Sequence, residues 1–500
     1  MEKNVRPSFG IALFIFLAII ATLSIGMFVL KVDLHPLLII CILFTALICM
    51  KVGFTWENVE LALCNGINRA MTSMFIFILI GMLIGSWTQS GTIPGLVYYG
   101  LGLLSPQFFL PAGFIVCSIM SFATGTCWGT GGTLGVALLG MGAGMGMPLP
   151  LVAGMVISGA YFGDKMSPVS DTNNLSTVNS GANIYGHIAS MARTAIPTFI
   201  ISLALYSIIG ISYAGASYNA ADVEAIRSTI AGKFHINIAI LLPLVVLLIV
   251  SFLKVAPVPA LFSGVVAGNI IAALVQGTSL HDILTCLNYG FSSETGNAVV
   301  DKIVNNGGIQ DMMWTFSLAF IAVTLGGLLD DMKILEVLIE KVVVKIKSQF
   351  SLVTTTIFSS IISNAAMGEN YLSSIINSRL WGRAYDKLGM QRRMLSRCVE
   401  EGANLTSALI PWTTAGAFFY GAFKINPFVY APYAFSNYIC FLMTIVLAFF
   451  GIAIVKVPAE GKKDRFYEME QANLHRAVAS GDIKFNPREI EQTPHGDVTA

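Results

Sequence analysis

The chain has 500 residues, of which 55% are hydrophobic and 11% are charged, with a mean hydropathy of +0.74 and a net charge of +1. A water-soluble protein would carry roughly a quarter charged residues, so the composition excludes a soluble globular protein and predicts an all-α polytopic membrane protein. The 8 cysteines are scattered without a C-x-x-C pair, so neither a disulfide framework nor a zinc site is expected.

Several apolar stretches approach the roughly 20 residues that a helix needs to cross the hydrocarbon core. About ten full spans are predicted, two of them interrupted by polar residues: 9–30, 35–50, 69–87, 149–175 (interrupted), 194–213, 236–253, 256–275, 311–329, 398–422 (interrupted) and 432–455. Two more apolar regions, 107–140 and 350–379, are too long for one span and contain polar clusters at their middle. Each is expected to be a re-entrant hairpin whose tip lies inside protein or a water-filled cavity.

Lysines and arginines predict the orientation, because they are enriched in cytoplasmic loops. Lys3 and Arg6 precede the first span and a basic tail follows the last one, so both termini are expected in the cytoplasm. Basic residues flank 350–379 on both sides, whereas the flanks of 107–140 contain none. The second hairpin is therefore predicted to enter from the cytoplasm and the first from outside, in a multi-pass protein of the cytoplasmic membrane.

The two halves of the chain resemble each other weakly, and equivalent flanks have opposite charge character, as in inverted repeats. The predicted organisation is an N-terminal helix pair (1–65), a first inverted repeat (66–213), connecting spans with a polar segment (214–307), a second inverted repeat (308–455) and a cytoplasmic tail (456–500).

The first interrupted span contains the most polar stretch, Asp164–Asn174. A carboxylate inside a span costs about 2.5 to 3.5 kcal/mol on insertion scales, so it tends to be functional. Ser167-Pro168 is a helix-start signal, which predicts a helix to about Phe162, an unwound stretch and a short helix from Pro168. The alternative is a cytoplasmic loop whose polar residues only cap the next helix. The break would offer oxygen ligands to a small cation from Asp164, Ser167, Asp171, Thr172 and Asn173.

The tip of the first hairpin is rich in glycine and threonine. The hydroxyls of Thr124, Thr126 and Thr130 suit a cation or a carboxylate substrate. The alternative is close helix packing through Gly125-x-x-x-Gly129.

The tip of the second hairpin contains Asn364, Glu369 and Asn370, and Glu369 is its one strong acid. At membrane depth this acid needs a partner or a role. A structural ion pair with Arg379 or Arg383 is the alternative to a place in a transport site.

The second interrupted span contains Pro411, which removes a helix hydrogen bond and frees a carbonyl one turn earlier. Glu400 and Glu401 lie close to Arg397, and an interfacial ion pair there is as well supported as a site role. The neutral candidate ligands around this break are Asn404, Thr406, Ser407 and Thr413.

The stretch Phe162–Leu175 (FGDKMSPVSDTNNL) resembles the signature of the NhaC family of sodium/proton antiporters. The segments Ser121–Thr130, Asn306–Ile309 and Thr406–Trp412 agree with that family, and the resemblance covers about residues 60–455. It implies a secondary transporter built of inverted repeats with paired re-entrant hairpins. The family includes a malate/lactate exchanger and transporters of amino acids.

The chain departs from the usual family pattern at three positions. Ala408 stands where the first proline of Thr-Ser-Pro-Leu-Ile-Pro-Trp-Asn is usual, Thr413 stands for its asparagine, and Glu369 stands where an aspartate is more usual. These positions lie where an organic substrate could sit.

The predicted function is the exchange of Na+ for H+ at a mid-membrane carboxylate, Asp164 or Asp171, which holds either ion and thereby couples the two fluxes. The alternative is Na+- or H+-coupled transport of a small carboxylate or an amino acid. No nucleophile triad or metal-ligand spacing is present, so enzyme activity, a resident cofactor and nucleic-acid binding are not expected. Lipid is the expected surrounding partner, and a homodimer is compatible with the sequence.

Overall fold

The computed structural model describes residues 5–213, 220–459 and 462–479. Regular structure in these residues is helical, with short 3-10 and π segments and two isolated β-bridges. Among these residues, 8 helices are long and apolar enough to cross a membrane, and bent helix pairs raise the number to as many as 10. The predicted all-α polytopic fold is confirmed.

The first three long helices precede the hairpin region. They are α1 (Phe9–Ser24), which continues as η1 (Ile25–Val29), α2 (Leu34–Val52) and α3 (Trp56–Gln89). The helix that contains the predicted third span, 69–87, begins earlier, at Trp56, with a reciprocal capping box between Thr55 and Asn58. Lipid-facing positions of α1 and η1 are apolar, as Phe14 (62% exposed) and Phe28 (66% exposed) illustrate.

The region 107–140 forms a helix–turn–helix, in agreement with the predicted hairpin. It comprises α5 (Pro106–Thr124), α6 (Cys127–Thr130), η2 (Gly131–Gly135) and α7 (Val136–Gly144), and α4 (Thr92–Leu103) precedes it. Gly125 turns the chain at the tip with φ +68°, and a Cβ atom there would lie 2.9 Å from the backbone carbon of Val169. Only glycine allows both this backbone conformation and this close approach to the break of the first interrupted span.

The first interrupted span consists of α8 (Leu149–Met166) and α9 (Asp171–Ser180), and α10 (Ile184–Ser212) follows it. The chain is broken, but the predicted boundaries are wrong. The helix continues beyond Phe162 to Met166, and the new helix starts at Asp171 with Ser170, not Ser167, as its N-cap. The reason is Pro168, which forces Ser167 into an extended conformation (φ −83°, ψ 128°) and ends α8.

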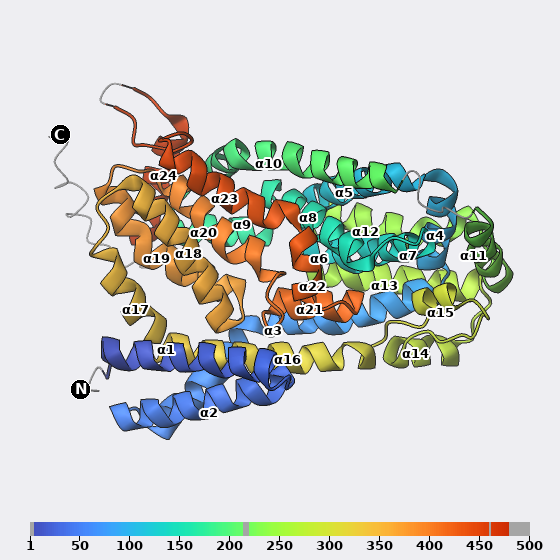
Figure 1. Cartoon of the computed structure of the whole chain (residues 1–500), viewed down its shortest axis with the longest axis horizontal. Helices are drawn as coiled ribbons and strands as arrows, with labels where there is room; N and C mark the ends of the chain where they lie inside the picture. Colours follow the sequence, from blue (N-terminus) through green and yellow to red (C-terminus); the bar gives the residue numbers. More distant parts are fainter. Residues whose placement is uncertain (1–4, 214–219, 460–461, 480–500) are drawn as a thin grey trace.

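The connecting region contains α11 (Ala220–Lys233), η3 (Ile238–Leu241), α12 (Leu242–Phe252), α13 (Pro257–Leu274), α14 (Leu280–Tyr289) and α15 (Ala298–Val304). The short η4 (Gln310–Met312) follows it, at the start of the predicted second repeat. Residues 214–219 of this predicted segment lie outside the described residues. Figure 1 shows α4, α11, α14 and α15 together at one end of the molecule.

The second half contains α16 (Met313–Asp331), α17 (Ile334–Val343), α18 (Gln349–Met367), α19 (Asn370–Lys387), α20 (Arg392–Ser407), α21 (Thr414–Phe423), α22 (Pro427–Tyr430), η5 (Ala431–Tyr433) and α23 (Phe435–Phe449). The predicted second hairpin is the pair α18–α19, which turns at Gly368 with φ +67°. The predicted second break separates α20 from α21. That the two halves are inverted repeats stays a prediction.

The predicted tail contains one further helix, α24 (Arg465–Ala479). Residues 460–461 and 480–500 of the tail, and Lys3 at the other end of the chain, lie outside the described residues. One end of the molecule, opposite α4 and α11, contains the beginning of α1 together with the helices α17 and α24 (Figure 1). Arg6 reaches Glu336 of α17 at 3.2 Å, which ties the start of the chain to this end.

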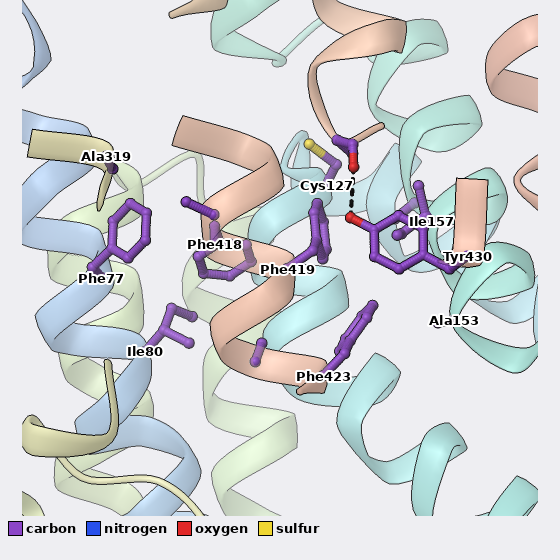
Figure 2. Close-up of a cluster of buried hydrophobic side chains, with 14 of the residues drawn as sticks. Phe77, Ile80, Cys127, Ala153, Ile157, Ala319, Phe418, Phe419, Phe423 and Tyr430 are labelled. Carbon is purple, nitrogen blue, oxygen red and sulfur yellow. Dashed lines mark hydrogen bonds between the residues drawn. The ribbon is translucent and has the colours of Figure 1, made fainter. Parts of the chain in front are cut away.

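Figure 2 shows how α21 joins the two halves of the core. Phe418 stacks on Trp128 of the first hairpin with ring centroids 4.7 Å apart and meets Phe77 of α3 edge-on at 5.9 Å. Phe419 lies on the other side of α21, toward Ile157 of α8 (Figure 2). These rings fix the second break against the first hairpin, and therefore position the site described below.

The backbones of α3 and α16 approach each other closely in the core. A Cβ atom at Gly66 would lie 2.9 Å from the Cα atom of Gly327 and would also overlap the carbonyl oxygen of Val323. The substitution Gly66→Val should therefore lower the free energy of unfolding by about 1–3 kcal/mol, because packed backbone cannot yield. Gly10→Val is the control, because nothing lies within 4 Å of its Cβ position. Thermal unfolding in detergent tests this, and equal midpoints for the two variants would contradict it.

Candidate functional site

The break between α8 and α9 is held together by one side chain, that of Asn173. Its amide nitrogen lies within hydrogen-bond distance of three carbonyl oxygens at the end of α8, those of Asp164 (3.1 Å), Lys165 (2.9 Å) and Ser167 (2.9 Å). The Asp164 carbonyl also accepts the backbone N–H of Ser167 at 3.0 Å. Its amide oxygen lies 3.3 Å from Nε2 of His187. Both polar atoms of Asn173, a predicted cation ligand, are thus engaged in shaping the break.

Two buried carboxylates meet beside this break. Asp164 is 1% exposed and Glu400 of α20 is 0% exposed. The hydroxyl of Thr172 lies 3.0 Å from Glu400 Oε1 and 3.5 Å from Asp164 Oδ2, and the amide nitrogen of Asn404 lies 2.6 Å and 3.5 Å from the same two atoms. Ser176 donates to the other oxygen of Glu400 at 2.7 Å. The two acids therefore share two donors across the interface of α8, α9 and α20.

One carboxylate oxygen of this pair lacks a hydrogen-bond partner among the described residues. This atom, Asp164 Oδ1, is buried. An unsatisfied buried oxygen is costly, and in native structures it often marks the place of a proton, a water or an ion. A small cation or a proton on Asp164 would satisfy it.

A buried ion pair lies directly beside the two acids. Lys165 Nζ is 2.9 Å from Glu401 Oε1, and the two side chains are 1% and 0% exposed. Thr194 donates to the same carboxylate oxygen at 2.9 Å, and the Sγ atom of Cys440 lies 2.9 Å from Nζ. This pair is internally compensated, whereas no ion pair of Asp164 or Glu400 is found among the described residues.

The alternative interfacial pairing of Glu400 and Glu401 with Arg397 does not describe these contacts. The guanidinium of Arg397 instead donates to the carbonyl oxygens of Ser190 (3.0 Å) and Ala453 (3.2 Å). Both glutamates point into the protein.

Asp171 has a different environment from Asp164. Its side chain is exposed and accepts a hydrogen bond from the Tyr371 hydroxyl at 2.6 Å. It lines a cavity of about 130 Å³ together with Thr124 and Thr126 of the first hairpin tip and Lys254 of the turn between α12 and α13. The two predicted Na+ ligands, Asp164 and Asp171, thus lie on two sides of the break, one buried and one at a cavity.

Glu369 forms the start of α19 at the tip of the second hairpin. It is 1% exposed, and its carboxylate accepts the backbone N–H of Tyr371 at 3.3 Å as the N-cap. Arg379 is exposed and lies ten residues further along the same helix, which corresponds to about 15 Å. This separation disfavours the alternative ion pair of Glu369 with Arg379.

The same tip also contacts the second interrupted span. The Asn370 amide donates to Asn404 Oδ1 at 3.0 Å, and the Asn364 amide donates to the carbonyl oxygen of Ala403 at 2.9 Å. Asn370 therefore belongs to the surroundings of the carboxylate pair, through Asn404.

Other predicted ligands bond their own backbone. Thr130 donates to the carbonyl of Thr126, Thr406 to that of Gly402 at 2.5 Å, and Thr413 to that of Ser407 at 2.5 Å. Ser167 accepts the backbone N–H of Val169 at 3.4 Å. Ser407 is buried, and its hydroxyl has no partner within the described part of the chain. The structure does not bring these side chains into the carboxylate pair.

The sequence prediction left Glu400 open between an ion pair with Arg397 and a site role, and it did not name Ser176 or Tyr371. For Glu400 a signal was available, because it precedes the predicted ligand Asn404 by four residues and so shares its helix face. Tyr371 has no such signal, since its contact with Asp171 depends on the tertiary fold.

A sequence profile of the Na+/H+ antiporter family matches residues 159–452. Over 460 residues, 91% of its length, the chain is 36% identical to the Na+/H+ antiporter NhaC of Alkalihalophilus pseudofirmus and covers 98% of that protein. The chain belongs to the NhaC family of Na+/H+ antiporters. The resemblance found in the sequence is confirmed.

Other relatives of this NhaC-family chain have different names. It is 33% identical over 88% of its length to the malate-2H+/Na+-lactate antiporter of Bacillus subtilis, covering 94% of that protein. It is 31% identical over 93% of its length to the arginine/ornithine antiporter ArcD of Halobacterium salinarum, covering 96% of that protein.

The Lys165–Glu401 pair gives a prediction for stability. Lys165→Met and Glu401→Gln should each lower the free energy of unfolding by about 3–5 kcal/mol, because each leaves the other charge buried and alone. The double variant should lose clearly less than the sum. Glu340→Gln, which breaks the exposed pair with Arg6, should cost less than about 1 kcal/mol. Thermal unfolding in detergent measures all four, and additive losses in the double variant would contradict the pairing.

Proposed function

We propose that the protein exchanges Na+ for H+ across the cytoplasmic membrane and that the exchanged ions bind at the Asp164–Glu400 pair. Membership of the antiporter family supports the exchange. The observation that supports the location is the sharing of Thr172 and Asn404 by two buried acids. Ionisable groups at membrane depth mark ion pathways and proton relays, because their cost of insertion is high.

Electrostatics supplies the coupling between the two ions. Two carboxylates that share the same donors in a buried site repel each other when both are ionised, so one positive charge stabilises the pair. A proton on one acid or a Na+ ion between them supplies that charge. Because either ion satisfies the same deficit, binding of one disfavours binding of the other, and each transport cycle exchanges them.

The donor set suits Na+. Carboxylate and hydroxyl oxygens of Asp164, Glu400 and Thr172 surround the proposed position, and Asp164 Oδ1 lacks a partner among the described residues. Hard oxygen donors are the ligands that small, hard cations prefer. Lys165 lies next to Asp164 in sequence, but its charge is directed to Glu401.

In this proposal Asp171 lies on the path between the cavity and the pair. It is exposed at the cavity and adjacent in sequence to Thr172, which contacts both acids. An ion entering from the cavity would meet Asp171 first. Its hydrogen bond with Tyr371 links this step to the second hairpin.

We also propose the orientation and the organisation in repeats that the sequence predicts. Both termini would be cytoplasmic, and the repeats 66–213 and 308–455 would be related by inversion, with their hairpins moving against the remaining helices during alternating access. The contact between Arg6 and Glu336 and the position of α24 support a common side for both ends of the described chain.

Substitutions of the pair test the proposed site. Asp164→Asn and Glu400→Gln each remove a charged ligand worth about 1.5–3 kcal/mol, so the apparent Na+ affinity should fall by about 10- to 100-fold. Asp171→Asn should slow exchange with a smaller effect on affinity, because Asp171 is outside the pair. Everted membrane vesicles with a pH-sensitive dye report the Na+-driven pH change. Glu60→Gln, at an exposed position of α3, is the control.

Undiminished Na+-driven pH changes in both Asp164→Asn and Glu400→Gln would contradict the proposed site. Saturable uptake of a labelled organic acid or amino acid that requires Na+, without a Na+-driven pH change in its absence, would instead support the alternative function.

A further inference from the structure

The N-terminus of α20 is capped by a residue of the tail. Glu470 of α24 is fully buried, and its two carboxylate oxygens accept the backbone N–H groups of Arg392 (3.2 Å) and Arg393 (3.0 Å). Gln391, at the N-cap position of α20, makes no cap with its own side chain. That side chain donates to the carbonyl of Lys456 at 2.7 Å. The cap that α20 requires is therefore supplied by another helix.

The helix α24 also holds the end of α9. A Cβ atom at Gly181, which ends α9, would lie 2.5 Å from Cδ2 of Leu474. The amide of Asn473 donates to the carbonyl oxygen of Ala182 at 3.4 Å. In Figure 1, α24 lies across the end of the bundle beside α10 and α20. It thus bridges the two helices that carry Thr172, Ser176, Glu400 and Asn404.

We propose that α24 is a clamp on the ends of α9 and α20, and that Glu470 is the positioning residue through which pH sets its strength and thereby the rate of exchange. Glu470 touches no transported ion in this scheme. It acts through α20, whose capped end lies about 12 Å, or two turns, from Glu400. A docked α24 holds α9 and α20 in one relative position, and its release lets them move.

The charges around Glu470 determine how it responds to pH. Burial raises the pKa of Glu470 to about 7, while the guanidinium of Arg393 and the two backbone N–H groups lower it by less. Arg393 also pairs with Asp464, and Arg392 pairs with Asp386 at 2.6 Å. The charged and titratable groups that face this contact are Arg392 and Arg393 of α20, Asp386 of α19, Arg193 of α10, and Asp464 and Tyr467 next to Glu470 in the tail.

The raised pKa fixes the direction of the effect. In the docked helix Glu470 has a pKa of about 7, whereas in the released helix it has the ordinary pKa of 4.5. The docked form therefore binds a proton more tightly. Docking is strongest below pH 4.5 and weakens as the pH rises to about 7. Above that value the loss is complete, at most about 300-fold in the docking equilibrium. Alkaline pH at this end of the molecule therefore loosens the clamp and accelerates exchange.

The variant Glu470→Gln tests the proposal, because it keeps the shape and cannot ionise. Wild-type exchange in everted vesicles should rise several-fold as the pH passes through about 7, and Glu470→Gln should lack this rise. Glu468→Gln, an exposed position of the same helix, should keep it. Equal pH profiles of Glu470→Gln and Glu468→Gln would overturn the proposal.

Hydrogen exchange of α24 is a second readout that does not depend on transport. After correction for the intrinsic rate, protection of the wild-type helix should fall by up to about 300-fold over the same pH interval. In Glu470→Gln it should stay constant. If the variant does not fold, wild-type protection that is independent of pH overturns the proposal. Asp164→Asn should lower the apparent Na+ affinity yet keep the hydrogen-exchange response of α24, which separates a failure of the clamp from a failure of the ion site.

Discussion

Buried charge is the constraint on which the rest of the structure depends. The bundle encloses Asp164, Lys165, Glu400 and Glu401 at 1% exposure or less, where each isolated charge would cost several kcal/mol. One acid is compensated by the lysine and receives a threonine hydroxyl. The other two share the donors Thr172 and Asn404, and no ion pair of either acid is found among the described residues. The proposed function assigns the missing positive charge to a proton or a Na+ ion, next to the permanent ion pair on α8 and α20.

The backbone groups that the helix interruptions leave without partners are satisfied by capping side chains. Each end left by a break is capped locally, by Ser170 at α9, Glu369 at α19 and Thr413 at α21. The amide of Asn173 donates hydrogen bonds to the carbonyl oxygens at the end of α8. These side chains are used to cap helix ends, so the candidate site is formed by other polar groups. Many conspicuous polar residues of the sequence are thus architectural, and fewer of them face an ion.

The sequence predicted the architecture better than the site, for a physical reason. Apolar length, glycine at the tips and Pro168 depend on local chemistry, so the spans, the hairpins and the first break could be predicted from them. The exact N-cap could not be predicted, since Ser167 and Ser170 are both good N-caps. In the structure Ser167 lies in the extended segment before Pro168, and Ser170 accepts the backbone N–H of Asn173. For Glu400 and Glu401 an interfacial ion pair with Arg397 and a site role stayed equally supported, because a sequence does not show which helix face is covered. The docking of α24 onto α20 joins residues too distant in the chain for any local pattern to reveal.

The hairpin helix α19 connects features that otherwise seem separate. Its first residues are tied to both breaks, Asn370 to Asn404 and Tyr371 to Asp171. Its last turn contains Asp386, whose carboxylate accepts a hydrogen bond from the guanidinium of Arg392 at the capped start of α20. Because α19 is one continuous helix with contacts at both ends, a shift at one end moves the other end as well. Under the two proposals, occupancy of the ion site and docking of the tail are thermodynamically linked through α19. Ion binding then changes the docking equilibrium of α24 by the same factor by which docking changes the ion affinity.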